Sequence, residues 1–233
     1  MRNVFVANEH FFHNDATILT SQRHESYTWY QALKVDKKGE SISRMALEHG
    51  RNVLVEKPMV SHYREAQELF SFAKQRGVMI FEAITNQYLT NYQLIRESLA
   101  KLGVIRLIRM NYSQYSSRYE RFRQGTVLPA FDPAKAGGAL MELNTYNLHF
   151  VTGLFGAPDS YRYYSNLIRG IDVSGVMMME YPGFLAVLTA AKDSCSLNMS
   201  PQTLSAIVWP ENLSPAMLNS FLCFGLKIHC FLY

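Results

Sequence analysis

The spacing of hydrophobic residues alternates between helix-like and strand-like from about residue 42 onward. Residues 42–50, ISRMALEHG, have the pattern of a helix that ends at a glycine, and the apolar run at 52–56, NVLVE, is typical of a buried strand. Residues 61–77 return to helical spacing, and 78–84, VMIFEAI, form a second apolar run. Strand, helix and strand in this order predict a βαβ unit with parallel strands and a right-handed crossover.

A different pattern follows in the second half of the chain. Residues 91–103 predict a helix, 104–115 a strand with one wetter face, and 137–156, GGALMELNTYNLHFVTGLFG, a long helix. Residues 170–181 then alternate as on a half-buried strand, and a Pro-Gly turn leads into 184–192, FLAVLTAAK. The predicted fold class is therefore α/β plus α+β, with a partial parallel sheet followed by a helix and a mostly antiparallel sheet.

This pattern divides the chain into three segments. Residues 1–111 are expected to form the α/β portion, and residues 112–194 the α+β portion, whose sheet begins as early as residue 104. Residues 195–233 contain three prolines and no continued alternation, and they are left unassigned. The first 42 residues show no clear strand followed by a glycine turn, so no element is predicted there.

The composition is that of a globular chain and argues against a nucleic-acid or membrane partner. Hydrophobic residues make up 48% and charged residues 18%, and the net charge of +4 comes from Lys and Arg scattered singly. A nucleic-acid-binding surface would normally show a basic stripe. The apolar stretch at 221–233 is interrupted by Lys227 and His229 and is too short to span a bilayer.

The cysteines indicate a reducing compartment. Cys195, Cys223 and Cys230 are an odd number, and the first residues lack the charged start and apolar core of a signal peptide, so a cytoplasmic location is expected. Cys223, His229 and Cys230 match no common zinc spacing, and no metal site is predicted.

Lys57 is the first candidate for chemistry, because it follows the buried strand at 52–56 and precedes Pro58. Ligands of open α/β sheets bind beyond the carboxyl ends of the strands, and a lysine fixed there can donate to a substrate oxygen or exchange a proton with it. The alternative is a surface lysine paired with Glu56, and position alone gives the two interpretations equal weight.

The helix at 137–156 carries the second candidates. Glu142, Tyr146 and His149 lie at i, i+4 and i+7 and therefore share one face. A tyrosine hydroxyl can pass a proton to or from an alcohol when a nearby cation lowers its pKa, and Lys57 could be that cation. The alternative is that Tyr146 and His149 are core residues with satisfied polar ends, which spacing alone favours by roughly two to one.

The two motifs together resemble the Gfo/Idh/MocA family of NAD(P)-dependent oxidoreductases, named for glucose-fructose oxidoreductase and inositol dehydrogenase. The resemblance runs from about Ser43 to Ser194. It rests on residues 53–84, VLVEKPMVSHYREAQELFSFAKQRGVMIFEAI, followed by the motif at 137–156. It implies a Rossmann-type first portion and places Lys57 at the active site. Glu142 and Tyr146 match the second motif, and a tyrosine there resembles the glucose-fructose oxidoreductase and dihydrodiol dehydrogenase branch.

The resemblance also implies the reaction. Hydride would pass between a substrate carbon and NAD or NADP, while Tyr146 moves the hydroxyl proton and Lys57 holds the oxygen. Glu56 and Pro58 would shape the cofactor side. The substrate would be a sugar, polyol or diol, and a homodimer would form through the outer face of the second sheet. Residues implied to line the substrate pocket, besides Glu142, are Asn147, His149, Tyr115 and Arg118.

One family feature is missing from the sequence. A G-x-G-x-x-G turn after a first strand would hold the pyrophosphate, and no such segment precedes Lys57. The expectation is a chain truncated at its N-terminus and divergent at its C-terminus, which binds the cofactor weakly or not at all. Two hypotheses follow: an oxidoreductase of this family, or a noncatalytic truncated member that serves as a folded scaffold or association module.

Overall fold

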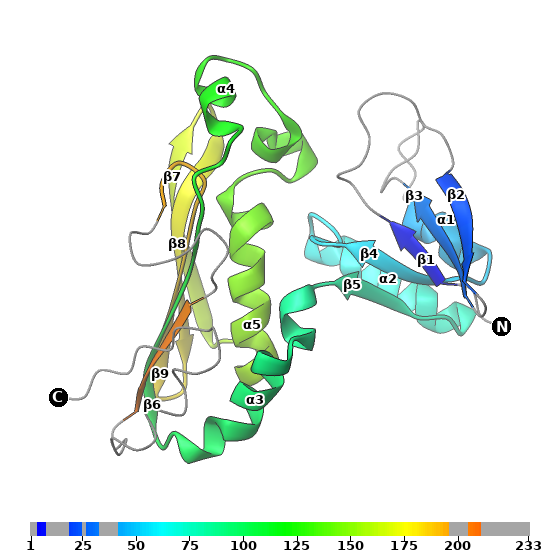
Figure 1. Cartoon of the computed structure of the whole chain (residues 1–233). Coiled ribbons are helices and arrows are strands. Elements are labelled where there is room, and N and C mark those ends of the chain that lie inside the picture. Colours follow the sequence, from blue (N-terminus) through cyan, green and yellow to red (C-terminus); the bar gives the residue numbers. More distant parts are fainter. Residues whose placement is uncertain (1–3, 8–18, 25–26, 33–41, 196–204, 211–233) are drawn as a thin grey trace. The chain divides into compact units, whose positions relative to one another are not determined.

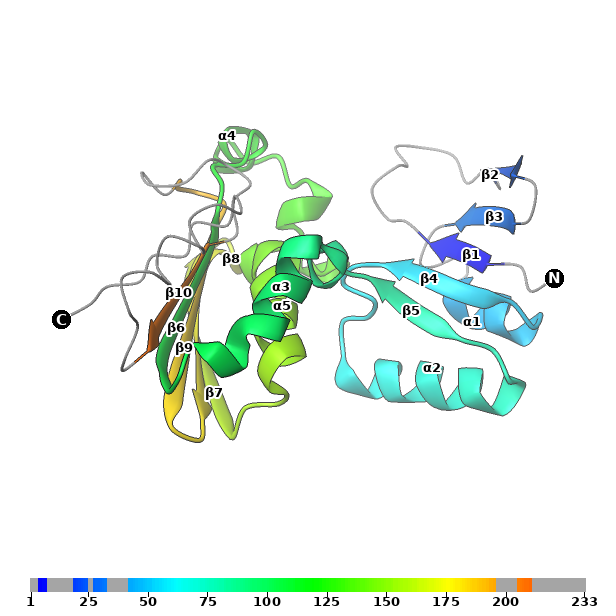
Figure 2. The same ribbon diagram turned by 60° about the horizontal axis from the view of Figure 1, so that its bottom comes forward.

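The computed structural model describes residues 4–7, 19–24, 27–32, 42–195 and 205–210. They divide into two compact units, Met1–Ile84 and Thr85–Tyr233, each with its own sheet (Figures 1 and 2). Among these residues no helix is both long and apolar enough to cross a membrane.

The sheet of the first unit has five strands in the order β2-β3-β1-β4-β5. β1 (Val4–Ala7) is parallel to both of its neighbours, β3 (Tyr27–Ala32) and β4 (Asn52–Glu56). β5 (Ile80–Ala83) is parallel to β4, and β2 (Leu19–His24) pairs antiparallel with β3 at the edge. The sheet is therefore mostly parallel, and the carboxyl ends of β1, β4 and β5 lie at one edge.

Two helices pack against this sheet. α1 (Ile42–Glu48) and α2 (Tyr63–Arg76) share a core with β4, in which Val53 and Val55 are fully buried. α2 ends at Gly77, which has φ 63° and donates its N–H to the last carbonyls of the helix. The predicted βαβ unit is confirmed, because α2 connects the parallel strands β4 and β5.

The sheet of the second unit also has five strands, in the order β10-β6-β9-β8-β7. β6 (Ile105–Ser113) is parallel to β9 (Phe184–Ala191), whereas β7 (Ser160–Ile168), β8 (Ile171–Tyr181) and β10 (Ser205–Pro210) make antiparallel pairs. The predicted mostly antiparallel sheet is thus confirmed, and so is the fold class of the whole chain.

α5 (Thr145–Phe155) lies along one face of this second sheet (Figures 1 and 2). Its buried Phe150 and Val151 belong to one core with Met177 of β8 and Leu188 of β9. A π-helix, Leu140–Asn144, comes directly before α5. The shorter helices of this unit are η1 (Thr85–Tyr88), α3 (Thr90–Ser98), η2 (Leu99–Lys101), α4 (Tyr119–Arg123), η3 (Pro129–Phe131) and η4 (Pro133–Lys135).

The structure differs from the sequence-based division in three places. The units divide after Ile84 rather than near residue 111, because α3 packs against η1 and shares a core with α5 in the second unit. The first 42 residues, for which no element was predicted, contribute three short strands. Part of the unassigned tail, Ser205–Pro210, pairs with β6. Short strands without a glycine turn or sustained alternation give too weak a pattern to predict.

Candidate active site

In the first unit, the chain leaves β4 at Glu56 and continues into Lys57 and Pro58, joined by a cis peptide bond. Glu56 pairs in register with Ala83 at the end of β5, so Lys57 lies at the carboxyl edge of the parallel sheet. Lys57 is only 6% exposed. The alternative of an exposed surface lysine is therefore wrong, whereas the predicted position at the sheet edge is confirmed.

Glu82 holds the segment that follows Lys57. The N–H of Met59 donates to the Glu82 Oε1 at 2.8 Å, and Glu82 lies on β5 beside β4. Met59 is itself buried among the apolar residues of the unit. Because a carboxylate accepts a backbone N–H strongly, this bond fixes the turn that carries Lys57 and Pro58.

In the second unit, Glu142 and Tyr146 lie in successive turns, one in the π-helix and the other in α5. The ring of Tyr146 packs against that of Tyr112 on β6, with centroids 5.4 Å apart. Burial, and to a smaller extent the Glu142 carboxylate, raises the pKa of Tyr112. Glu142 and Tyr146 are thus brought together at one end of β6, and π-helical turns are frequent at functional sites.

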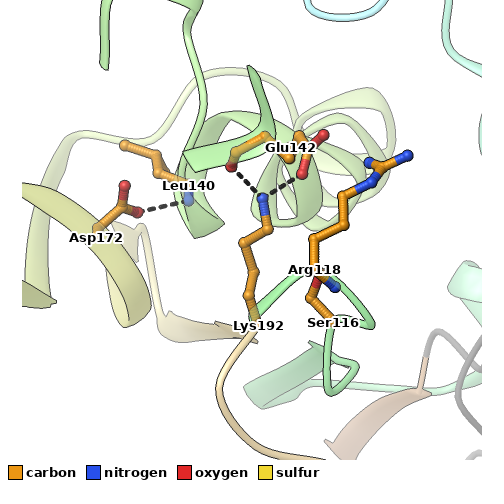
Figure 3. A network of polar contacts seen from close by, with 7 residues as sticks. Ser116, Arg118, Leu140, Glu142, Asp172 and Lys192 are labelled. Atoms are coloured by element: carbon orange, nitrogen blue, oxygen red, sulfur yellow. Dashed lines mark hydrogen bonds and ion pairs between the residues drawn. The ribbon is translucent and has the colours of Figure 1, made fainter. Parts of the chain in front are cut away.

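Lys192 is a functional candidate that the sequence analysis did not identify. It follows β9, and its Nζ forms an ion pair with Glu142 and also donates to the carbonyl of Ala130 (Figure 3). The same Nζ lies 4.4 Å from the centroid of the Phe131 ring. The signal that identified Lys57, a charged residue at the carboxyl end of an apolar strand, is also present at Lys192 in FLAVLTAAK.

Burial controls the protonation of this lysine. Desolvation lowers the pKa of Lys192, and the neighbouring Glu142 carboxylate acts in the opposite direction. Arg118, which lies beside Glu142 in Figure 3, lowers the pKa further. The lysine is therefore easier to deprotonate than an exposed one, and the ion pair with Glu142 favours its charged form.

Asp172 of β8 anchors the start of the π-helix. Its Oδ2 accepts a hydrogen bond from the N–H of Leu140 at 2.7 Å (Figure 3). It accepts another from the hydroxyl of Tyr163, also at 2.7 Å. Burial, with the hydrogen bond to Asp172, raises the pKa of Tyr163. Gly138 leaves the space for this carboxylate, since a Cβ there would lie 1.9 Å from Asp172 Oδ1.

Gly138→Ala is expected to lower the free energy of unfolding by about 3 kcal/mol or more, because it adds strain at φ +103° and displaces Asp172 from its hydrogen bonds. Chemical denaturation would measure the loss. Gly170→Ala is the matched control: its φ is +79° and its Cβ would have no atom within 4 Å, so only the strain of about 1–3 kcal/mol is expected. Equal losses in the two variants would contradict the role of Asp172.

The other predicted pocket residues are placed as follows. Asn147 is fully buried, and its side-chain amide donates to Asn144 Oδ1 and to the carbonyl of Thr189 on β9. The amide of Asn147 thus joins the helix to the sheet, and its place in the substrate pocket stays a prediction. His149 is half-buried on the next turn of α5, and its carbonyl accepts a hydrogen bond from Gln87. Its role in the substrate pocket stays a prediction.

Tyr115 and Arg118 are on the surface of the second unit. Tyr115 is 44% exposed, and its hydroxyl donates to Glu120, which also pairs with Arg123. Arg118 is exposed and lies nearer to the ion pair of Glu142 with Lys192. Of these two, only Arg118 lies beside Glu142 and Lys192. Across the residues that the structure describes, no group of three His, Cys, Asp or Glu side chains could hold a metal ion.

Known proteins resemble the chain in both sequence and structure. Residues 5–84 match the family described as "Oxidoreductase family, NAD-binding Rossmann fold". A scyllo-inositol 2-dehydrogenase (NADP(+)), IolU, from Bacillus subtilis is 40% identical over 151 residues, 64% of this chain and 46% of that protein. A trans-1,2-dihydrobenzene-1,2-diol dehydrogenase from Bos taurus is 30% identical over 144 residues, 60% of this chain and 41% of that protein.

The likeness extends to solved structures. The WlbA dehydrogenase from Bordetella pertussis, in complex with NADH and UDP-GlcNAcA, superposes with a TM-score of 0.56 at 18% identity, covering 67% of this chain and 50% of that one. At this identity the likeness concerns the fold.

The matched region defines the first unit as a Rossmann-type unit of the kind found in this oxidoreductase family. The resemblance to the Gfo/Idh/MocA family that the motifs indicated is confirmed by the family match over residues 5–84 and by the similar dehydrogenases. It spans about half the length of the curated relatives that it matches.

Proposed function

We propose that the chain acts as an NAD(P)-dependent oxidoreductase on a CH–OH group of a sugar, polyol or diol. The observation that carries this proposal is the 40% identity to the scyllo-inositol 2-dehydrogenase over 151 residues. The name of the second relative adds a cyclic diol to the substrate class. The substrates in both names are alcohols. In a CH–OH group the carbon can lose a hydride to the nicotinamide and the hydroxyl can lose a proton.

The first unit would receive the nicotinamide end of the cofactor. Its parallel strands end together at the edge where Lys57 is buried and where Glu82 fixes the following turn, which fits the usual place of a nucleotide in an α/β sheet. Glu56 and Pro58 flank Lys57 on that edge. Residues 8–18, between β1 and β2, contain no glycine, so a G-x-G-x-x-G turn does not provide the amides for the pyrophosphate.

Lys57, Tyr146 and Glu142 would then have separate roles toward the substrate. The bound cofactor supplies hydride transfer. Lys57 would donate a hydrogen bond to the substrate oxygen, Tyr146 would exchange the hydroxyl proton, and Glu142 would accept a hydrogen bond from a second hydroxyl of a polyol or diol. The raised pKa of Tyr112 favours its neutral form, so this neighbour of Tyr146 would act as a hydrogen-bond donor.

Titration of the purified chain with NADPH and NADH, followed by nicotinamide fluorescence, tests the proposal. We expect saturable binding with a Kd of about 1 µM to 1 mM, the usual range for enzyme substrates, and weaker binding by Lys57→Ala. Reduction of NADP in the presence of scyllo-inositol or a cyclic trans-diol would then identify the substrate class. Absence of saturable binding by a chain that is folded by circular dichroism would refute the proposal.

A further inference from the structure

Two backbone hydrogen bonds fix the position of Lys192, independently of the contacts of its side chain. Its N–H donates to the carbonyl of Val173 on β8 at 2.8 Å, and its carbonyl accepts from the N–H of Ser116 at 2.8 Å. Ser116 follows β6, so Lys192 is tied to strands on both sides of β9. The direction in which the side chain leaves the sheet is therefore fixed by the fold.

The side chain of Lys192 lies behind the carboxylate that it contacts. The side chain is 3% exposed, whereas that of Glu142 is 17% exposed. The ring of Phe131 and the carbonyl of Ala130 also contact the ammonium group. Solvent, or a substrate, therefore reaches the carboxylate of Glu142 and not the lysine.

A buried pair of this kind contributes little net stability. The desolvation of two charges offsets most of their attraction, and a protein in which both partners are replaced by well-packed apolar side chains is often equally stable. What the pair does provide is a carboxylate with one orientation, because Lys192 holds one oxygen while the π-helix fixes the backbone of Glu142. Glu142 is close enough to Tyr112 to raise its pKa, and Tyr112 packs against Tyr146.

We propose that Lys192 is a positioning residue, which orients the carboxylate of Glu142 toward the substrate hydroxyls beside Tyr146. The inference rests on the proposed function, since it assigns Lys192 a part in that same reaction. It adds a residue from the end of β9, outside both sequence motifs, to Glu142 and Tyr146 of the second unit.

A double-mutant cycle on the full chain tests this inference. The four proteins are wild type, Lys192→Met, Glu142→Gln and the double variant, assayed with scyllo-inositol and NADP. We expect each single substitution to lower kcat/KM for the polyol by roughly ten- to a hundredfold, the size of one charge-assisted hydrogen bond, with the KM for NADP unchanged. Because Lys192 acts through Glu142, the double variant should lose no more than Glu142→Gln alone.

Further variants separate charge from packing. Lys192→Arg should restore part of the activity, while Lys192→Gln, which keeps a hydrogen-bond donor without the charge, should not. Lys135→Met removes an exposed lysine of the same unit and should leave kcat/KM unchanged. If Lys192→Met does not fold, the comparison of the Arg and Gln variants decides the question.

The outcomes also separate this inference from the proposed function. Multiplied losses in the double variant, or an active Lys192→Met with unchanged kcat/KM, would overturn the positioning role and leave the proposed function intact. A folded wild-type chain that neither binds NADPH nor oxidises the polyol would overturn both. A loss confined to the KM for NADP would assign Lys192 to the cofactor side and also overturn the inference.

Discussion

Tyr146→Phe is expected to lower kcat for alcohol oxidation by about 10²–10⁴-fold, the contribution of one general acid or base. The substitution removes only the hydroxyl, while the ring can keep its contact with Tyr112 at 5.4 Å between centroids. The affinity for NADPH should not change, because Tyr146 lies in the second unit. Steady-state rates and fluorescence titration measure the two quantities.

The control for Tyr146→Phe is Tyr161→Phe. Tyr161 is a tyrosine of the same unit that is 72% exposed on β7, and its substitution should leave kcat within about twofold, since exposed positions away from a site rarely matter. A Tyr146→Phe enzyme as active as wild type would assign proton transfer to another group.

Lys57→Met is expected to lower kcat/KM by about 10²–10³-fold, the usual cost of removing one preorganised donor to a reacting oxygen. Lys57 is 6% exposed, and methionine keeps the apolar packing of the lysine stem, so the variant should remain folded. Circular dichroism and chemical denaturation would verify this. A folded variant with this loss of activity is the result that distinguishes a functional lysine from a structural one.

Lys74→Met is the matched control in the same unit. Lys74 is exposed in the last turn of α2, and its loss should change neither the rate nor the unfolding midpoint noticeably. Equal rates for Lys57→Met and Lys74→Met would remove Lys57 from the site. A large loss of stability in Lys57→Met would instead indicate that the lysine mainly supports the turn held by Glu82.

The elements with strong periodicity could be predicted from the sequence. α2 keeps helical spacing up to a glycine with positive φ, and β8 buries Ile171, Val173, Met177, Met179 and Tyr181 on alternate positions. The hairpin between β8 and β9 follows from the Pro-Gly turn. These features depend on local chemistry, so the sequence carries them directly.

The site could be predicted only in part. Lys57, Glu142 and Tyr146 stand in two compact motifs, whereas Lys192 reaches Glu142 only because β9 runs beside β6 and under the π-helix. Helical spacing predicted that Asn147 lies beside Glu142 and Tyr146. It did not show that the side-chain amide of Asn147 donates to the carbonyl of Thr189 in the sheet. Contacts that depend on strand order are set by the tertiary fold, and one sequence does not reveal them.

The place of β6 in the second sheet affects how that sheet forms. The β8–β9 hairpin closes through a tight turn, but β6 pairs Leu107 with Leu185 of β9 and Ile108 with Val208 of β10, residues far apart along the chain. The entropy of closing such long loops must be lost before the pairing stabilises the sheet. We therefore expect the hairpin to form first, and β6 to join the sheet late in folding although it lies inside it.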